Sequence, residues 1–407
     1  MDSLISADKV KLSTKKKIIL FANPLSGSNQ ARKYLQLYSK ALAFEVENSA
    51  VKLYIYELTS DKGRREGTQK IASLMSKTDE KIRVVVAGGD GSLIWIIEEL
   101  LRSEIDIKKV DLGILPFGTG NDLSCMLGWG RSPMSHLIGN SLEGLKNSIQ
   151  TWMEATPQNL DIWSIEIDVE ENGYFQKISK HVHGFERKNI TDDNGNISKS
   201  YQRLMTNYFS IGLDARIGLG FDKRRSKKKC FNKCIYVWEG FKKMCCLRVP
   251  KLKTMVNSFI EAENKVIFDN SAPGETNLPR NTSVFLMLNS RTYAGQDHYV
   301  WDKAKSKSNS TFQPQNPRDG LLESMYFRGN FDLGLEQVPG LGGRATKLNQ
   351  GAGPFVLNFA PMDDEEEVRV YMQIDGEYFY AVRPKQARVS LSNISKEGVS
   401  ILVRQKK

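Results

Sequence analysis

The feature that most constrains the fold is a unit repeated through the first third of the chain: an apolar run, a glycine-bearing loop and a helical stretch. Three such loops follow apolar runs at 18–22, 82–87 and 111–115. Apolar runs separated by helices are typical of a parallel sheet that is covered on both faces. The carboxyl ends of parallel strands meet at one sheet edge, where such folds bind ligands. The sequence therefore predicts an α/β domain whose three loops lie together.

The second half of the chain is expected to be rich in β-strands. Residues 161–169 alternate in polarity, and Asn172-Gly173 is a typical hairpin turn between two strands. Further strands are expected at 284–288, 321–327, 355–359 and 368–374. This pattern predicts a mainly antiparallel β-sandwich. The expected division is a polar tail (1–15), an α/β domain (16–155) and a β-rich domain (156–403).

The three loops carry the predicted chemistry. Glycine lets a backbone approach phosphate oxygens closely, and the N–H groups at the start of a following helix attract anions. None of the loops is a Walker A sequence or a G-x-G-x-x-G dinucleotide fingerprint. The glycines suited to a phosphate site are Gly27, Gly88, Gly89, Gly91, Gly118 and Gly120.

Asp90 lies between glycines directly after an apolar strand. A carboxylate among phosphates repels them unless it binds a cation or accepts a proton, so Asp90 is predicted to coordinate Mg²⁺ or to act as a general base. A simpler interpretation stays open for each loop alone: Gly-Gly-Asp-Gly is a common turn, and Asn121-Asp122 is a common helix start. The occurrence of three loops on consecutive strands favours the functional interpretation.

The positive charge of the chain is concentrated in one basic segment, residues 223–253. It holds twelve Lys or Arg and one acidic residue, Glu239, whereas the whole chain has a net charge of +11. Such a segment indicates an anionic partner, either a membrane surface or a nucleic acid. Its aromatic residues are spaced as on a helix face and do not form a recognised stacking motif, so no nucleic acid is expected.

The chain is expected to be cytoplasmic. No apolar run is long enough for a membrane span, and the first apolar run, 18–22, is too short for the core of a signal peptide. The cysteine count of five is odd, and Cys245 and Cys246 are adjacent, which disfavours a disulfide framework. Cys230 and Cys234 lack a second Cys/His pair at zinc spacing.

The motifs resemble those of the diacylglycerol kinases. Residues 86–92 (Val-Ala-Gly-Gly-Asp-Gly-Ser) and 115–124 (Leu-Pro-Phe-Gly-Thr-Gly-Asn-Asp-Leu-Ser), followed by Gly128-Trp129-Gly130, resemble their catalytic domain. Segments of the second half resemble their accessory domain: 207–215, 218–221, 319–323 and 372–377. The resemblance covers residues 16–403.

The resemblance implies a lipid kinase that transfers the γ-phosphate of ATP to diacylglycerol with Mg²⁺ and produces phosphatidic acid. It implies that ATP lies between the two domains. Asp375, Gly376 and Glu377 match a segment that returns to the nucleotide in related sphingolipid kinases. The other residues that the resemblance assigns to ATP are Asn23, Ser26, Gly27, Thr59, Gly88, Gly89, Gly91, Ser92, Gly118 and Thr119.

The resemblance also implies a carboxylate base for the lipid hydroxyl. The candidates are Asp90, Asp319 and Glu323, of which Asp90 is favoured. Asp319 has a second interpretation as the turn residue that opens a strand, and Glu323 has one as a solvent-facing strand residue.

The lipid acceptor is the least constrained part of the prediction. A related lipid kinase that acts on sphingosine, ceramide or monoacylglycerol is the alternative, although Thr119 and residues 207–215 favour diacylglycerol. Ser92 stands where these kinases usually have threonine, and residues 290–295 match the family pattern only loosely. Because the substrate lies in a bilayer, we expect peripheral membrane association through the basic segment.

Overall fold

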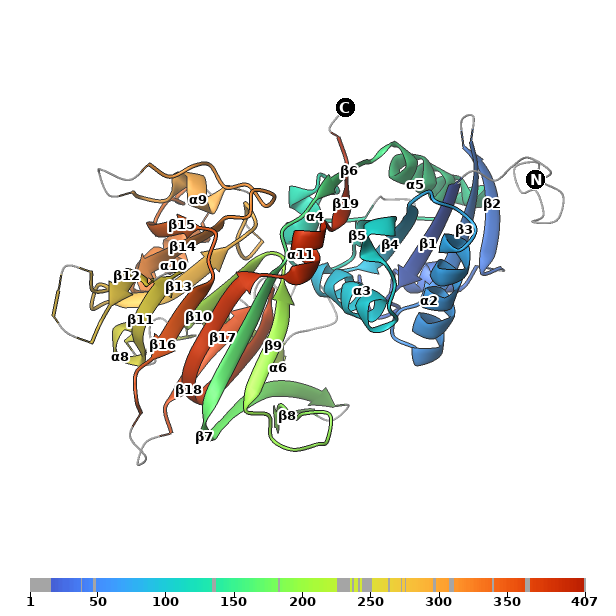
Figure 1. Ribbon diagram of the computed structural model, residues 1–407. Coiled ribbons are helices and arrows are strands. Elements are labelled where there is room, and N and C mark those ends of the chain that lie inside the picture. The colour runs from blue at the N-terminus through green and yellow to red at the C-terminus, as the bar shows by residue number, and fades with distance from the viewer. Residues whose placement is uncertain are drawn as a thin grey trace. The chain divides into compact units, whose positions relative to one another are not determined.

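The chain forms two compact units in the computed structural model: unit 1 is Met1–Leu160 with Asn393–Lys407, and unit 2 is Asp161–Ser392 (Figure 1). Each unit is described by itself. The structure describes residues 16–405 except 38, 47–48, 134–136, 182–183, 225–234, 236–237, 241, 244–250, 263, 272, 275, 296–297, 307–310, 339 and 363–366.

Unit 1 contains a seven-stranded sheet with the order β2-β3-β1-β4-β5-β19-β6. The strands from β3 to β19 are parallel, whereas β2 and β6 at the two edges are antiparallel to their neighbours. The sheet is therefore mixed, and the predicted parallel sheet is its central part. The strands are β1 (Lys16–Ala22), β2 (Ala41–Val46), β3 (Ser49–Glu57), β4 (Ile82–Gly88), β5 (Val110–Pro116), β6 (Thr156–Asn159) and β19 (Ser400–Val403).

The longest helix of unit 1, Asp61–Met75, is specified by residues at its start and within it. Its N-cap residue Ser60 accepts a hydrogen bond from the Gly63 N–H, and Gly67 allows the helix to approach Phe21 and Tyr56 of the sheet. The helices of unit 1 are α1 (Arg32–Leu35), α2 (Asp61–Met75), α3 (Asp90–Arg102), α4 (Asp122–Met126), α5 (Glu143–Glu154) and α11 (Asn393–Glu397), with short 3₁₀ turns at Ile107–Lys109 and Asn140–Leu142.

Unit 2 contains one twelve-stranded sheet whose pairings, within the described residues, are antiparallel. The prediction of a mainly antiparallel domain is confirmed, but one continuous, nearly barrel-like sheet replaces the two facing sheets of a sandwich. Its strands are β7 (Trp163–His181), β8 (Gly184–Asn189), β9 (Ser200–Met205), β10 (Tyr208–Gly212), β11 (Val256–Glu261), β12 (Lys265–Asp269), β13 (Thr282–Leu288), β14 (Leu322–Arg328), β15 (Thr346–Gly351), β16 (Phe355–Phe359), β17 (Arg369–Ile374) and β18 (Glu377–Leu391).

The predicted hairpin turn at Asn172-Gly173 is wrong, because β7 runs through it from Trp163 to His181. A Cβ at Gly173 would lie 2.7 Å from the carbonyl oxygen of Val382 on β18, where the β7–β18 register shifts. The glycine is therefore needed for a close approach between strands and not for a turn.

Strand β13 is buried on both faces and separates two apolar cores. Phe285 and Met287 belong to one core, whereas Val284, Leu286 and Leu288 belong to the other. The helices of unit 2 whose bounds lie in the described residues are α6 (Leu213–Arg224), α8 (Leu252–Met255), α9 (Val300–Lys303) and α10 (Gly329–Glu336). Among the helices that the structure describes, none is both long and apolar enough to cross a bilayer.

Candidate functional site

The three predicted loops meet at one edge of unit 1. They follow β1, β4 and β5, which are neighbouring parallel strands (Figure 1). The backbones are joined across the edge, because the Asn23 N–H donates to the Ala87 carbonyl (3.0 Å) and the Phe117 N–H donates to the Gly88 carbonyl (2.9 Å). The Asn23 side-chain amide also donates to the Ser92 hydroxyl (3.2 Å). The prediction that these loops lie together is confirmed.

The glycines allow the second and third loops to touch. A Cβ at Gly89 would lie 3.0 Å from the Gly118 Cα, and one at Gly118 would lie 2.7 Å from the Gly89 Cα. The distance from Gly118 is shorter than a real Cβ allows, and the distance from Gly89 leaves room for a Cβ only if the neighbouring backbone shifts by a few tenths of an ångström. Of the six loop glycines, only Gly27 has a positive φ (63°). Close packing, more than backbone conformation, accounts for Gly88, Gly89 and Gly118, whereas a Cβ at Gly91 would meet no protein atom within 4 Å.

Asp90 connects two of the loops. It is the first residue of α3, and its carboxylate accepts a hydrogen bond from the Leu123 N–H (3.1 Å) at the start of α4. The side chain is half-buried at the sheet edge. An acidic group at this helix start is stabilised by the helix dipole. Asp90 therefore holds the third loop in place and also adds negative charge where phosphates are predicted.

The third loop is held by its own polar side chains. Asn121 adopts a left-handed conformation (φ 55°) and donates to the carbonyls of Gly118 (3.1 Å) and Arg131 (2.7 Å). Arg131 in turn lies 3.6 Å from the Asp122 carboxylate and donates to the Gly120 carbonyl. The Asn121-Asp122 pair is thus a structural support of the loop as well as a helix start.

The remaining unit 1 candidates also lie at this edge. Thr59 directly follows β3, the neighbour of β1, and its hydroxyl donates to Glu57 (2.6 Å). Ser26 follows β1, and Thr119 is exposed after β5. All the predicted phosphate and nucleotide residues of unit 1 therefore belong to one edge of one sheet.

Mg²⁺ fits this edge only if phosphate oxygens of the substrate supply part of its coordination. Among the described residues there is no group of three or more His, Cys, Asp or Glu side chains placed to hold a metal ion. Mg²⁺ in phosphoryl-transfer sites is commonly held by one or two carboxylates together with phosphate oxygens. Asp90 at the loop edge meets that requirement, so the residues present are compatible with Mg²⁺ bound as a nucleotide complex.

The unit 2 candidates gather at one edge of the second sheet. Strands β17, β10, β13 and β14 are neighbours in this order. Because they are antiparallel, one edge of the sheet contains the end of β17, the start of β10, the end of β13 and the start of β14. The register pairs Tyr208 with Leu288, and Leu288 with Glu323. The segments around Asp319, Glu323 and Asp375 are therefore brought to the same edge.

Asp375 is an anchor for the loop that precedes β10. It occupies a two-residue turn with Gly376, both at positive φ (49° and 82°), which is the geometry that Asp-Gly hairpins favour. Its carboxylate accepts hydrogen bonds from the N–H groups of Thr206, Asn207 and Tyr208 (2.7–2.9 Å) and from the Thr206 hydroxyl. Burial raises the pKa of Asp375 to about 6 in spite of these donors. Glu377 is exposed, 3.8 Å from Arg203.

The two remaining carboxylate candidates differ in environment. Asp319 is exposed in a turn and accepts from the Leu321 N–H (3.0 Å), and partial burial raises its pKa. Glu323 is fully buried on β14, where one oxygen accepts from the Gln350 amide (2.9 Å). Burial, more than any other cause, raises the pKa of Glu323 to about 8. The raised pKa favours the protonated carboxyl of Glu323 at neutral pH, and the burial of its side chain shows that the solvent-facing interpretation is wrong.

Sequence reasoning missed the residues that position this edge. Asp161 accepts from the Gly320 N–H (2.7 Å) beside Asp319. Asn289 donates to the carbonyls of Asp161 (2.9 Å) and Thr206 (2.7 Å), so it ties two of the loops together. The buried Asp214 accepts from Tyr293 (2.6 Å) and Gln373 (2.7 Å). The signal available in the sequence was a polar residue directly after an apolar strand, as Asn289 directly follows β13.

Glu323→Gln should change how stability depends on pH. A carboxyl whose pKa is raised on folding stabilises the folded state below its ordinary pKa, and this contribution is lost as pH rises through the raised value. A shift of the pKa from 4.5 to about 8 corresponds to on the order of 5 kcal/mol. The Gln variant keeps the acceptor for Gln350 but does not ionise, so its free energy of unfolding should fall less between pH 5.5 and 8.5.

Urea unfolding at both pH values measures this difference, with Glu186→Gln, an exposed change in unit 2, as the control. Parent and Glu323→Gln curves that shift equally with pH would show that Glu323 is already ionised in the folded protein.

Comparisons with known proteins match two separate stretches of the chain. A family model described as the diacylglycerol kinase catalytic domain matches residues 17–153, and one described as the diacylglycerol kinase accessory domain matches residues 204–378. The first match contains the three-loop edge, and the second contains Asp319, Glu323 and Asp375. Together they define the class of the protein, a kinase built from a catalytic and an accessory domain.

The chain belongs to the diacylglycerol kinase family. It is 27% identical to diacylglycerol kinase 4 of Arabidopsis thaliana over 386 residues, which cover 86% of this chain and 76% of that protein. It is 26% identical to diacylglycerol kinase 7 of the same plant, over 75% of this chain and 65% of that protein. It is also 26% identical to diacylglycerol kinase iota of Homo sapiens, over 93% of this chain and 31% of that protein. The chain thus spans about a third to three quarters of the length of these relatives.

Proposed function

We propose that this chain is an ATP-dependent diacylglycerol kinase that produces phosphatidic acid. The observation that carries the proposal is the meeting of three glycine loops at one sheet edge, inside the stretch that matches the family's catalytic domain. Matches to diacylglycerol kinases over most of the chain support the choice of acceptor.

The loop edge supplies positioning and charge neutralisation, which account for most of the catalysis in phosphoryl transfer. Backbone N–H groups of Gly88–Ser92 and Gly118–Thr119 bind the triphosphate oxygens, with Asn23, Ser26, Gly27 and Thr59 around them. Mg²⁺, when bound, neutralises phosphate charge. The primary hydroxyl of diacylglycerol attacks the γ-phosphorus, the bond to the β-phosphate oxygen breaks, and ADP leaves.

The hydroxyl proton passes to a carboxylate, for which we propose Asp90. Asp90 is half-buried at the three-loop edge, where its carboxylate accepts the Leu123 N–H at 3.1 Å, whereas burial raises the pKa of Glu323 to about 8. Asp319 is the second candidate, since its carboxylate is exposed. Asp375 accepts four hydrogen bonds, so we propose that it shapes the loop rather than contacts ATP directly, while Gly376 and Glu377 remain nucleotide candidates.

Purified protein with labelled ATP and Mg²⁺ should phosphorylate diacylglycerol in mixed micelles. Sphingosine, ceramide and monoacylglycerol, tested in the same micelles, should react at least about tenfold more slowly in kcat/KM, a difference of ~1.4 kcal/mol in the barrier. A preference for one of these three lipids would replace diacylglycerol as the acceptor, and no product from any lipid would contradict the kinase assignment.

We also propose that the basic segment, 223–253, holds the enzyme at an anionic membrane surface. Six of its twelve cations, including Lys227, Lys228 and Lys229, lie outside the described residues. In the described part, Glu239 is buried and pairs with Arg224 and with Lys243 (3.1 Å). The segment's one acidic residue is thus already neutralised, which leaves the other cations for lipid headgroups.

A further inference from the structure

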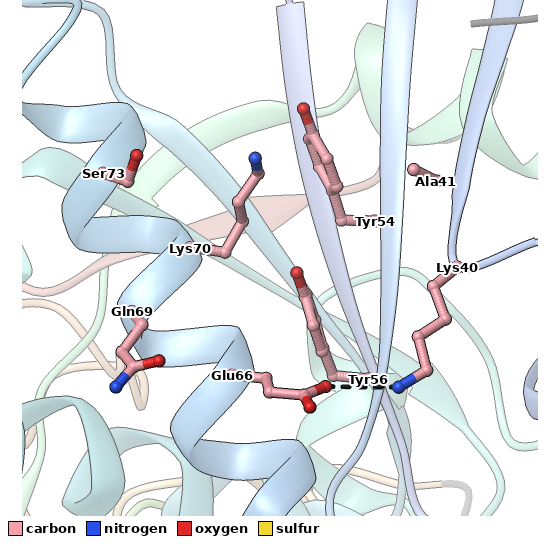
Figure 2. A pocket seen from close by; sticks show the side chains of 8 residues that line it. All are labelled: Lys40, Ala41, Tyr54, Tyr56, Glu66, Gln69, Lys70 and Ser73. Carbon is pink, nitrogen blue, oxygen red and sulfur yellow. Dashed lines mark hydrogen bonds and ion pairs between the residues drawn. The ribbon is translucent and has the colours of Figure 1, made fainter.

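A solvent-open hollow of about 480 Å³ lies on unit 1 between α2 and the strand pair β2–β3 (Figure 2). This volume is in the range of small-molecule sites. Its floor is formed by Tyr54 and Tyr56, which are two residues apart and therefore on the same face of β3. Its lining is Lys40, Ala41, Tyr54, Tyr56, Glu66, Gln69, Lys70 and Ser73.

The charges around this hollow do not balance. Glu66 of α2 pairs with both Lys40 (3.2 Å) and Lys62 (3.8 Å), so its carboxylate is shared by two cations. Figure 2 shows Lys40 reaching Glu66 across the hollow. The ion pairs that the structure describes for the lysines of this site all involve Glu66. The site therefore has an excess of positive charge.

Two further lysines lie near one tyrosine ring: Lys70, which lines the hollow, and Lys52, which is outside its lining. The Lys70 ammonium lies 4.4 Å from the centre of the Tyr54 ring, and that of Lys52, two residues before Tyr54 on β3, lies 5.6 Å from it. These cation–π contacts hold both ammonium groups near the floor but leave their N–H donors able to bind oxygen atoms. Two ammonium groups near one ring are suited to a doubly charged anion.

The neutral side chains of the lining are mostly hydrogen-bond donors. The hydroxyl of Ser73, the amide of Gln69 and the phenols of the two tyrosines can each donate to an anion. Burial, followed by the nearby Tyr54 and Glu66, raises the pKa of Tyr56, so its phenol stays protonated. A ligand with several acceptor oxygens and two negative charges matches this set of groups. The volume and the ring floor also accommodate an organic group that carries such a head.

We propose that the hollow between α2 and β2–β3 is a binding site for a phosphomonoester, held by Lys52 and Lys70 over Tyr54. The phosphomonoester can be a soluble metabolite or the headgroup of a lipid such as phosphatidic acid. The site uses side chains of α2 and β3 and none of the residues of the three-loop edge. It is therefore an effector site, distinct from the phosphates of ATP.

Calorimetric titration of the full-length protein tests the site without any need for catalysis. Glycerol 3-phosphate and short-chain phosphatidic acid below its micelle concentration are the two probes. Lys52→Ala/Lys70→Ala should weaken binding of the phosphomonoester about tenfold or more, because charge-assisted hydrogen bonds are lost. Lys109→Ala/Lys396→Ala, which removes two exposed lysines of unit 1 elsewhere, should bind like the parent.

A second pair of variants separates charge from shape. Ser73 is exposed on α2 beside the hollow. Ser73→Glu places a carboxylate at the hollow and should weaken binding, whereas Ser73→Gln, of similar size, should not. Binding of either probe supports the site. Binding of the lipid alone identifies a lipid headgroup as the ligand, binding of glycerol 3-phosphate alone identifies a soluble metabolite, and binding of both shows that the site accepts either source. No binding of either probe to the parent, or equal binding by parent and the Lys52/Lys70 variant, overturns the proposal.

Discussion

Asp90→Asn is expected to lower kcat for diacylglycerol phosphorylation by roughly 10³-fold, the loss typical of removing one preorganised charged group from a transition state. The amide keeps an oxygen that can accept the Leu123 N–H (3.1 Å), so the third loop should stay in place. What the variant loses is the negative charge needed to bind Mg²⁺ or to take the hydroxyl proton. Steady-state kinetics with labelled ATP measure the loss.

A matched control for this variant is Asp106→Asn. Asp106 is also an aspartate of unit 1 that accepts a backbone N–H, from Lys108 (3.1 Å), but it lies before β5, at the amino end of the strand. It should retain parental kinetics. Asp90→Asn with activity within about tenfold of the parent, less than ~1.4 kcal/mol in the barrier, would remove Asp90 from the catalytic role.

Gly118→Ala is expected to weaken ATP binding sharply and to lower the stability of unit 1. Its Cβ would lie 2.7 Å from the Gly89 Cα, and backbone cannot move aside as a flexible side chain can. Overpacking of this kind costs about 1–3 kcal/mol and would separate the second and third loops. Gly89→Ala should have a smaller effect of the same kind, because its Cβ would lie 3.0 Å from the Gly118 Cα and a shift of a few tenths of an ångström would relieve the contact. Nucleotide titration and thermal unfolding measure the two effects.

Gly91→Ala distinguishes an effect of loop packing on stability from an effect of direct phosphate contact on ATP affinity. A Cβ at Gly91 would meet no protein atom within 4 Å, and alanine is favourable at this position of α3. The Gly91 variant should therefore unfold at or above the parental temperature, whatever happens to ATP affinity. Parental nucleotide titrations for both Gly89→Ala and Gly118→Ala would place the ATP phosphates away from these loops.

The arrangement of the unit 1 site could be predicted from sequence because it follows from local patterns. Strands that are parallel and adjacent bring their carboxyl ends together, so Asn23, Asp90 and Gly118 meet without any knowledge of side-chain packing. The need for glycine could be predicted, but its cause could not. That Gly89 and Gly118 touch each other depends on the spacing of two strands, which no single loop reveals.

The parts that could not be predicted depend on contacts between distant residues. The antiparallel edge strand β6 pairs with β19, more than 240 residues later in the chain. Glu323 lies at an alternating strand position that is solvent-facing in a simple sheet, but β14 is covered on both faces. The four donors that converge on Asp375 come from residues about 170 positions earlier, so its structural role leaves no local signal.

The pairing of β19 with β5 and β6 has a consequence for biosynthesis. Unit 2 is encoded between β6 and the last strand of unit 1, so the ribosome completes unit 2 before β19 exists. Trp129, just after the third loop, donates to the Leu402 carbonyl (2.8 Å), and the Arg404 N–H donates to the Leu127 carbonyl (2.9 Å). Unit 1 of a nascent chain thus lacks the strand between β5 and β6 until residues 400–403 are translated, and a chain that stops before β19 cannot complete this sheet.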